Sequence, residues 1–294
     1  MTALPNPPST LRRSLAGTEC GCPRDFLGQR HVYAFVSPRM GGISAGVNLN
    51  PDRKCNFACV YCEVNRAEPP PAMSLDLDEM IAELKATLDL ISSGAICQRP
   101  AFQKVPAGLA CLRLVTLSGD GEPTLSPVFV DAVEAIVHLR ARARASFFKL
   151  VLLTNASGLD RPEVARSLEL FTVRDEIWAK LDAGTQAGMD RLNRGDRPLA
   201  DILENILELA RRRPVVIQSL FPALGGEAPD AADIEEYALR LRELVERGAQ
   251  IPLVQICSAM PTPFNAESGH LPLRKLSAIA RRVREVTGLK AAVF

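Results

Sequence analysis

The sequence lacks several features that would place a protein quickly in a class. It contains no run of about 18 apolar residues, so we expect no membrane-spanning helix and no membrane partner. Its proline-rich start has no apolar segment of the secretory type, so we expect a cytoplasmic protein. Basic residues (35 Lys and Arg) nearly balance acidic ones (34 Asp and Glu), so no overall charge directs the chain to a polyanionic partner.

Metal-binding residue types are scarce apart from cysteine. The three histidines, His31, His138 and His270, are scattered without metal-ligand spacing. The eight cysteines indicate thiolates for metal binding or catalysis, because disulfides are rare in the cytoplasm. We expect a flexible tail over residues 1–30 and one domain over residues 31–294.

From about residue 31 the patterns typical of strands and helices alternate along the chain. Ser74 is the predicted N-cap of the first helix. The predicted helices cover residues 74–91, 128–140, a segment from 162, 198–212, 231–247 and 273–286. Short apolar segments predict strands at 43–50, 112–117, 149–153, 176–181, 215–220 and 252–257, with a last one at 290–294.

This order of elements predicts an α/β fold. About six βα units in series form a parallel sheet with right-handed crossovers. No glycine-rich phosphate-binding motif follows the first predicted strand, which argues against a dinucleotide-binding fold. We therefore predict a partial (β/α)6 TIM-like barrel, with its chemistry on the loops that follow the strands.

Three cysteines, Cys55, Cys59 and Cys62, lie close together after the first predicted strand. Their spacing also fits one face of a helix, but the residues between them are mostly apolar and draw no amphipathic stripe. A zinc site usually needs four ligands in paired motifs, and no second pair of this kind lies elsewhere in the sequence. Three soft thiolates on one loop favour an iron–sulfur cluster that keeps one iron free.

The spacing of these cysteines, with Tyr61 just before the last, resembles the CxxxCx(aromatic)C signature of the radical SAM superfamily. The resemblance implies a [4Fe–4S] cluster on Cys55, Cys59 and Cys62 whose fourth iron binds S-adenosylmethionine. It also implies an electron donor such as flavodoxin or ferredoxin, and reductive cleavage of the sulfonium to a 5′-deoxyadenosyl radical. Tyr61 would lie beside the adenine.

The resemblance continues after the second and third predicted strands. Gly119, Asp120, Gly121 and Glu122 occupy the place of the family's motif for the methionine amine. Glycines let the backbone approach a ligand, and an ionised carboxylate accepts hydrogen bonds from an ammonium group. Asn155 resembles the Asn that ends the third strand in the family.

The ends of the later strands complete the predicted site. Lys180 and Asp182 lie on the same side of a strand by alternation, and at the carboxyl end of a barrel strand we expect them to be catalytic, with Lys180 also near the cofactor. Gln218 and Ser219 close the fifth predicted strand. Ile256 lies in the sixth, in a segment (255–261) where the family often uses backbone groups against adenine.

The subgroup most similar to this sequence is that of wyosine-synthase-like radical SAM proteins, over residues 31–263. Those synthases hold a second cluster on three further N-terminal cysteines, whereas this chain offers Cys20 and Cys22 in a CxC pair. These two are exposed thiols, a redox pair or ligands to an additional cluster. The shared residues are Ser37, Pro38, Arg39, Gly41, Gly42, Ser44, Gly46, Val47 and Asn48, together with the GEPT (121–124) and KLDAG (180–184) stretches.

The predicted function is therefore that of a radical SAM enzyme acting on a nucleoside in RNA or on a small molecule. The alternatives are an enzyme that modifies a protein or peptide, and a non-catalytic iron–sulfur or zinc protein. Arginine clusters near residues 140–144, 211–213 and 281–284 fall at predicted helix C-termini, where cations complement the helix dipole, and few aromatics accompany them. We expect Cys97, Cys111 and Cys257 to have packing roles.

Overall fold

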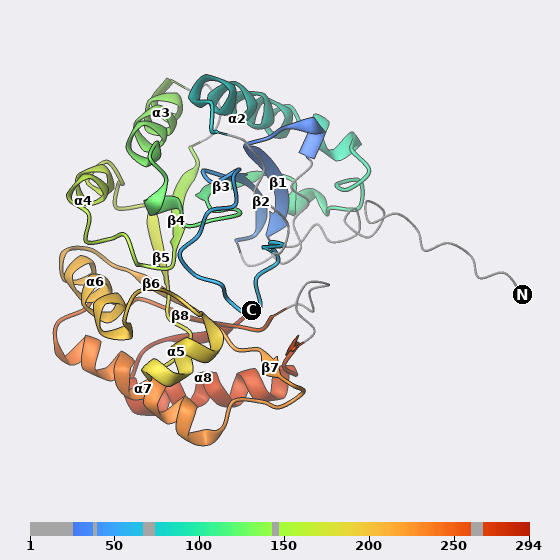
Figure 1. Ribbon diagram of the computed structural model, residues 1–294. Coiled ribbons are helices and arrows are strands. Elements are labelled where there is room, and N and C mark those ends of the chain that lie inside the picture. Colours follow the sequence, from blue (N-terminus) through green and yellow to red (C-terminus); the bar gives the residue numbers. More distant parts are fainter. Residues whose placement is uncertain (1–25, 38–39, 67–73, 143–146, 260–266) are drawn as a thin grey trace, which may run out of the picture.

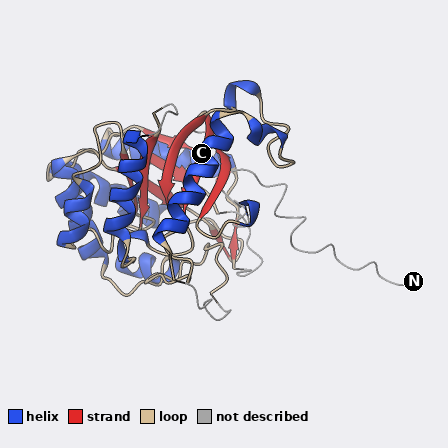
Figure 2. Cartoon of the chain, turned by 90° about the horizontal axis from the view of Figure 1, so that it is seen from above, coloured by secondary structure: helices blue, strands red, loops and turns tan. Residues whose placement is uncertain are grey.

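The computed structural model describes residues 26–37, 40–66, 74–142, 147–259 and 267–294. Its centre is a curved eight-stranded sheet in the order β1-β2-β3-β4-β5-β6-β8-β10 (Figure 1). β1 pairs antiparallel with β2 at one edge, and every later pairing is parallel. Seen from above, helices cover the outer face of the sheet (Figure 2).

The bounds of the elements follow the predicted alternation closely. The strands are β1 (Val32–Ser37), β2 (Gly42–Val47), β3 (Leu112–Leu117), β4 (Lys149–Thr154), β5 (Glu176–Lys180), β6 (Val216–Leu220), β8 (Val254–Cys257) and β10 (Ala291–Val293). β7 (Ala223–Leu224) and β9 (Ser268–Gly269) form a small separate ladder. The helices are α2 (Leu77–Ser92), α3 (Phe129–Arg142), α4 (Pro162–Leu168), α5 (Gln186–Leu192), α6 (Leu199–Arg212), α7 (Ala231–Glu246) and α8 (Leu273–Thr287).

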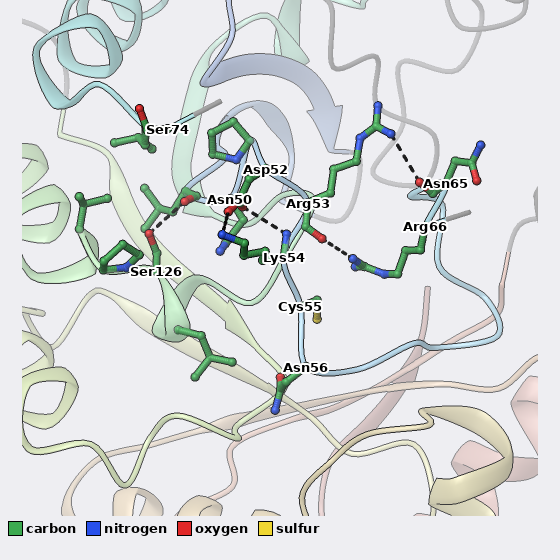
Figure 3. Close-up of a pocket in the computed structure, with 16 residues that line it drawn as sticks. Asn50, Asp52, Arg53, Lys54, Cys55, Asn56, Asn65, Arg66, Ser74 and Ser126 are labelled. Carbon is green, nitrogen blue, oxygen red and sulfur yellow. Dashed lines mark hydrogen bonds and ion pairs between the residues drawn. The ribbon is translucent and has the colours of Figure 1, made fainter. Parts of the chain in front are cut away.

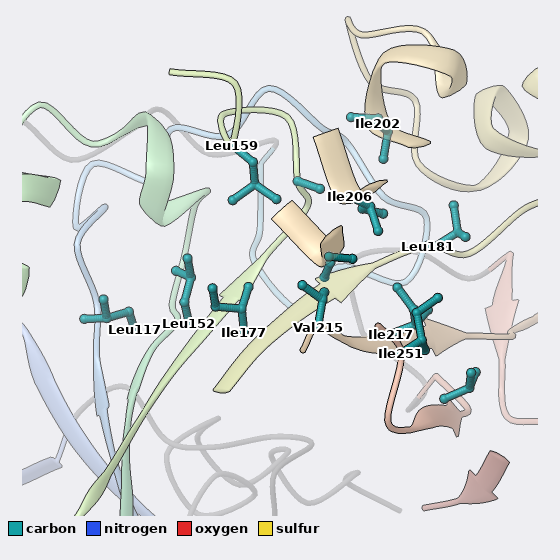
Figure 4. Close-up of a cluster of buried hydrophobic side chains, with 14 of the residues drawn as sticks. Leu117, Leu152, Leu159, Ile177, Leu181, Ile202, Ile206, Val215, Ile217 and Ile251 are labelled. Carbon is teal, nitrogen blue, oxygen red and sulfur yellow. The ribbon is translucent and has the colours of Figure 1, made fainter. Parts of the chain in front are cut away.

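The main core lies between the sheet and the helices (Figure 4). Side chains alternate along each strand, so one set points to the helices and the other into the barrel. Ile217 belongs to the outer set, whereas Trp178 and Val216 belong to a smaller apolar cluster inside the barrel. Apolar packing on both faces of the sheet therefore fixes the strands whose carboxyl ends carry the polar side chains.

The predicted fold class is confirmed: the chain is a mixed α/β protein with a mostly parallel sheet that forms a partial TIM-like barrel. The elements that were not foreseen include the antiparallel strand β1, the seven-residue helix α5 and the short strands β7 and β9. Among the described helices, none combines the length and the apolar character needed to cross a membrane.

The predicted cap of the first helix was wrong by two residues. The N-cap of α2 is Asp76, whose carboxylate accepts the backbone N–H of Glu79 at 2.9 Å. Asp76 is the better cap because its carboxylate satisfies an N–H group of the first turn, whereas the Glu79 carboxylate pairs with Arg30 and His31. Most of the predicted tail lies outside the described residues, but Phe26 is buried and packs edge-on against Phe102.

Candidate functional site

The three cysteines lie on the loop that leaves the carboxyl end of β2, and all three are partly buried. Each sulfur receives a hydrogen bond from a different N–H group. The backbone of Phe57 donates to Cys55 Sγ at 3.4 Å, the Asn193 amide to Cys59 Sγ at 3.5 Å, and the Arg66 guanidinium to Cys62 Sγ at 3.6 Å. Each of the three sulfurs therefore has its own N–H donor in the protein.

Burial favours the protonated form of two of these thiols. It raises the pKa of Cys55 to about 12 and also raises the pKa of Cys59. Burial therefore opposes a free thiolate at either position, and a bound metal would favour the thiolate. Within the ranges that the structure describes, no three His, Cys, Asp or Glu side chains converge to hold one metal ion. An iron–sulfur cluster does not require the three sulfurs to converge on one metal ion, because each cysteine binds a different iron.

The end of α5 fixes the backbone of this cysteine loop. The N–H groups of Ala58 and Val60 donate to the carbonyls of Asn193 and Leu192, both at 2.9 Å. Gly195 lies against the ring of Phe57, where a Cβ would come within 2.5 Å of a ring carbon. The loop is therefore docked on a segment more than a hundred residues later in the chain.

The chain that leads into the cysteine loop passes close to the two glycines of the predicted amine motif. A Cβ on Gly119 would lie 2.2 Å from Asn48 Oδ1, and one on Gly121 would lie 1.9 Å from the Lys54 carbonyl. Asn48 also bonds Asp120, donating to Oδ2 at 2.8 Å and accepting its backbone N–H at 3.1 Å. The close approach predicted at these glycines is thus made by the protein's own chain, and their contact with a cofactor stays a prediction.

Glu122 is a buried carboxylate with uncharged partners. Oε1 accepts from the backbone and hydroxyl of Thr124 at 3.1 and 2.6 Å and from the Thr154 hydroxyl at 2.6 Å. Oε2 accepts the Asn155 backbone N–H at 2.6 Å. Burial raises the pKa of Glu122, and these donors only partly offset it. The side chain ties the ends of β3 and β4 together and keeps acceptor capacity on Oε2.

Asn155, predicted to bind the cofactor, faces the cysteine loop. Its amide donates to Asn56 Oδ1 at 2.9 Å, and its oxygen accepts from the Ser157 backbone and hydroxyl. Asn56 in turn donates to Asp196 at 2.7 Å. Asn155 therefore positions the residue next to Cys55.

Lys180 and Asp182 form the pair that alternation predicted. Lys180 Nζ lies 3.5 Å from Asp182 Oδ1 and 4.9 Å from the centre of the Tyr61 ring. The Tyr61 hydroxyl donates to Asp182 Oδ2, which also accepts from the Asn193 amide at 2.7 Å. Burial raises the pKa of Tyr61 well above its usual value, so the phenol stays protonated and remains a donor. This network connects the cysteine loop to the interior of the barrel.

The residues predicted at the fifth and sixth strand ends lie on both faces of the sheet. Lys180, Gln218 and Gln255 are register partners on β5, β6 and β8, and the Gln218 amide donates to Gln255 at 3.1 Å. Ser219 points to the other face, where it is fully buried and bonds the Tyr237 hydroxyl and the Leu181 carbonyl. Its hydroxyl is therefore occupied on the helix side, because adjacent strand residues face opposite ways.

Ile256 likewise turns its side chain into the core on the helix side, and its carbonyl accepts the Phe294 N–H at 3.0 Å. A backbone contact between Ile256 and adenine stays a prediction. Of the remaining cysteines, Cys97 and Cys257 are partly buried and Cys111 is exposed. Cys20, Cys22, Pro38 and Arg39 lie outside the described residues.

Sequence reasoning missed Asn56, Arg66 and Asn193. Arg66 follows Cys62 by four residues, and a cation so near a thiolate motif was the available signal. Asn193 had a weaker one, since it ends a short helix after the β5 strand end, on the side of the barrel where sites are built.

A hollow of about 730 Å³ lies beside the cysteine loop, between it and the segments that lead into α2 and α3 (Figure 3). Cys55 and Asn56 form part of its wall, and Arg53 and Lys54 line it. Lys54 is exposed and pairs with Asp52 at 2.9 Å. Cys55 therefore borders a space outside the packed core.

No protein-family model matches the chain. A UPF0026 protein of Helicobacter pylori is 26% identical over 180 residues, which are 60% of this chain and 49% of that protein. A UPF0026 protein of Synechocystis sp. is 32% identical over 178 residues, 60% of this chain and 56% of that protein. The chain spans about half the length of the curated relatives it matches.

Solved structures with a similar fold are radical SAM enzymes. A radical SAM methyltransferase of Sphaerobacter thermophilus superposes with a TM-score of 0.66 at 19% identity, over 91% of this chain and 70% of that protein. SuiB of Streptococcus suis bound to its precursor peptide SuiA gives 0.60 at 14% identity, over 85% and 48%. TYW1 with a lysine–pyruvate adduct bound gives 0.54 at 16% identity, over 97% and 83%. The chain has the partial-barrel fold of these enzymes.

Proposed function

We propose that the chain is a radical SAM enzyme in which Cys55, Cys59 and Cys62 bind a [4Fe–4S] cluster. The observation that supports this most is the position of the three thiols and the hydrogen bonds that they receive. They lie on one loop at the carboxyl end of a barrel with the fold of radical SAM enzymes, and each sulfur has its own N–H donor. When bound, the cluster would supply one electron, received from flavodoxin or ferredoxin, for the reductive cleavage of S-adenosylmethionine to methionine and a 5′-deoxyadenosyl radical.

The chain's own residues would orient the cofactor and hold charge around it. Glu122 keeps acceptor capacity on Oε2 for the α-ammonium group of the methionine end, a charge-assisted contact. Tyr61 is fixed by Asp182, so its ring presents one defined surface for adenine. Lys180 brings a positive charge to the barrel interior, held by Asp182 beneath it.

The proposed substrate is a nucleoside in RNA or a small molecule. The similar folds belong to proteins as different as a methyltransferase, SuiB with a precursor peptide and TYW1 with a lysine–pyruvate adduct. Because one fold serves many substrates, the substrate class rests on the resemblance to wyosine-synthase-like proteins and on the polar row of Lys180, Gln218 and Gln255.

Iron content tests the cluster site. Anaerobically reconstituted protein should hold about four irons and four sulfides for each cluster. Replacing Cys55, Cys59 and Cys62 by Ala should remove this iron together with the thiolate-to-iron absorption band. The matched control replaces Cys97, Cys111 and Cys257 by Ala and should keep both. Full iron in the first triple variant would refute the assignment.

A further inference from the structure

Two of the three donors to the cysteine sulfurs come from side chains outside the cysteine motif. Asn193 ends α5 and reaches Cys59 Sγ at 3.5 Å, and Arg66 reaches Cys62 Sγ at 3.6 Å. The third donor, the Phe57 backbone, belongs to the loop itself. The two side chains can therefore be changed while the cysteines and the loop backbone remain.

The Asn193 amide is held in its orientation by stronger contacts than the one to sulfur. It is 4% exposed, and Nδ2 donates to Asp182 Oδ2 at 2.7 Å and lies 3.1 Å from the Tyr61 hydroxyl. Turning the amide would face its oxygen toward the Asp182 carboxylate, which is unfavourable. The donor is therefore directed toward Cys59 before any cofactor binds.

The Arg66 guanidinium is also fixed by partners other than sulfur. One of its nitrogens donates to the Arg53 carbonyl, and the nitrogen that contacts Cys62 also donates to the Asp120 carbonyl at 3.1 Å. Arg66 lines the hollow beside the loop, and its bond to the Arg53 carbonyl is visible in Figure 3. Both anchoring partners are uncharged carbonyls, and among the described residues Arg66 forms no ion pair, so its positive charge lies next to Cys62.

We propose that Asn193 and Arg66 set the reduction potential of the cluster, an inference that rests on the proposed function. The reduced form carries one more negative charge than the oxidised form. A hydrogen bond or a positive charge at the ligating sulfurs favours the reduced form and raises the potential. Asn193 acts by donation and Arg66 by donation and charge. Both are positioning residues that determine which one-electron donors are able to reduce the cluster.

The Asn193 amide also connects this control to the barrel interior. Asp182 Oδ2 accepts from Asn193, while Oδ1 faces Lys180 Nζ at 3.5 Å. A change in the charge near Lys180, such as binding of an anionic group, is transmitted through one carboxylate to the donor at Cys59. The potential should therefore also respond to Lys180→Met, in which the carboxylate loses its cation.

The test is an EPR-monitored redox titration of reconstituted full-length protein. Asn193→Leu and Arg66→Gln should each shift the midpoint potential to more negative values, and Arg66→Lys should recover part of the second shift. Asn205→Leu and Arg282→Gln are the matched controls, because the Asn205 amide bonds the Ala156 carbonyl and Arg282 pairs with Glu235 at the surface. Both should titrate like wild type.

Wild-type potentials in Asn193→Leu and Arg66→Gln with full iron content would overturn the inference while leaving the proposed function intact. A wild-type protein that binds no cluster would overturn the proposed function itself. Should Asn193→Leu load iron poorly, Asn193→Ala removes the same donor with less bulk. An unshifted midpoint in that variant and in Arg66→Gln again decides against the inference.

Discussion

Asp175 and Glu122 are buried carboxylates at opposite ends of the parallel sheet, and they differ in their partners. At the amino end, Asp175 accepts two hydrogen bonds from the Arg140 guanidinium, at 2.7 and 3.1 Å, and others from Leu150 and Thr172. At the carboxyl end, Glu122 accepts hydrogen bonds from uncharged groups alone, among the partners that the structure describes.

This difference separates stability from function. Burial raises the pKa of Asp175, but the hydrogen bonds from Arg140, Leu150 and Thr172 and the charge of Arg140 together outweigh it, so the pKa is lowered. Burial raises the pKa of Glu122. A buried charge paired with a cation inside the protein is complete by itself. A buried carboxylate without a cation is suited to a positively charged ligand, as the methionine ammonium group is. The Asp175–Arg140 pair at the amino end of the barrel then stabilises the fold, and Glu122 belongs to the carboxyl end, where we propose the site.

Arg140→Met should give the largest loss of stability, because it leaves Asp175 buried without its cation. The side chains of Arg140 and Asp175 are 8% and 0% exposed, and breaking such a pair costs about 3–5 kcal/mol of the free energy of unfolding. Urea denaturation measures it. Arg282→Met, which breaks an exposed pair with Glu235, should leave the urea midpoint nearly unchanged. Iron content should be unchanged in both variants. Loss of iron from Arg140→Met at a temperature where the variant is folded would contradict the assignment of this pair to stability.

Glu122→Gln should have a smaller effect on stability and a distinct effect on binding. The new amide would direct an N–H group at the Asn155 N–H, which costs about 1–3 kcal/mol. Loss of a charge-assisted contact should also weaken S-adenosylmethionine binding about ten- to a hundredfold. Equilibrium binding to the reconstituted protein measures this, with Glu235→Gln as the surface control. Wild-type affinity in Glu122→Gln would mean that the carboxylate serves the loops alone.

The two carboxylates should also give opposite pH dependences, which is the smallest of the expected effects. With its pKa raised in the folded state, Glu122 contributes stability below about pH 4.5 that is lost as the pH rises through the raised value. With its pKa lowered, Asp175 contributes stability above about pH 3.8 that is lost as the pH falls through the lowered value. Urea midpoints of wild type, Glu122→Gln and Asp175→Asn across this range should show gaps of opposite slope. Slopes of the same sign would contradict the assigned environments.

The fold was predictable because the hydrophobic pattern of each βα unit is local. The Lys180–Asp182 pair was predictable for the same reason, since alternation along one strand places both on one side. Ser219 was assigned to the site beside Gln218 although the same alternation turns it toward α7. The strand β1 and the helix α5 were missed because each is short and lacks a long amphipathic pattern.

The packing of the cysteine loop against α5 was not predictable from local sequence patterns. The Asn193 amide meets Cys59 across 134 residues of sequence, and the contact exists only because α5 docks on the loop. The motif glycines were expected to admit a cofactor, but their lack of a Cβ is used by the chain itself at Asn48 and Lys54. Spacing identifies which residues matter, whereas their partners follow from tertiary packing.

The most direct test of the account is the fate of S-adenosylmethionine. Under anaerobic conditions and with a strong one-electron reductant, reconstituted wild-type protein should convert it to 5′-deoxyadenosine and methionine, and the variant with Cys55, Cys59 and Cys62 replaced by Ala should not. Chromatography with mass detection measures both products. Formation of methylthioadenosine alone, or no cleavage by wild-type protein that holds an intact cluster, would contradict the account.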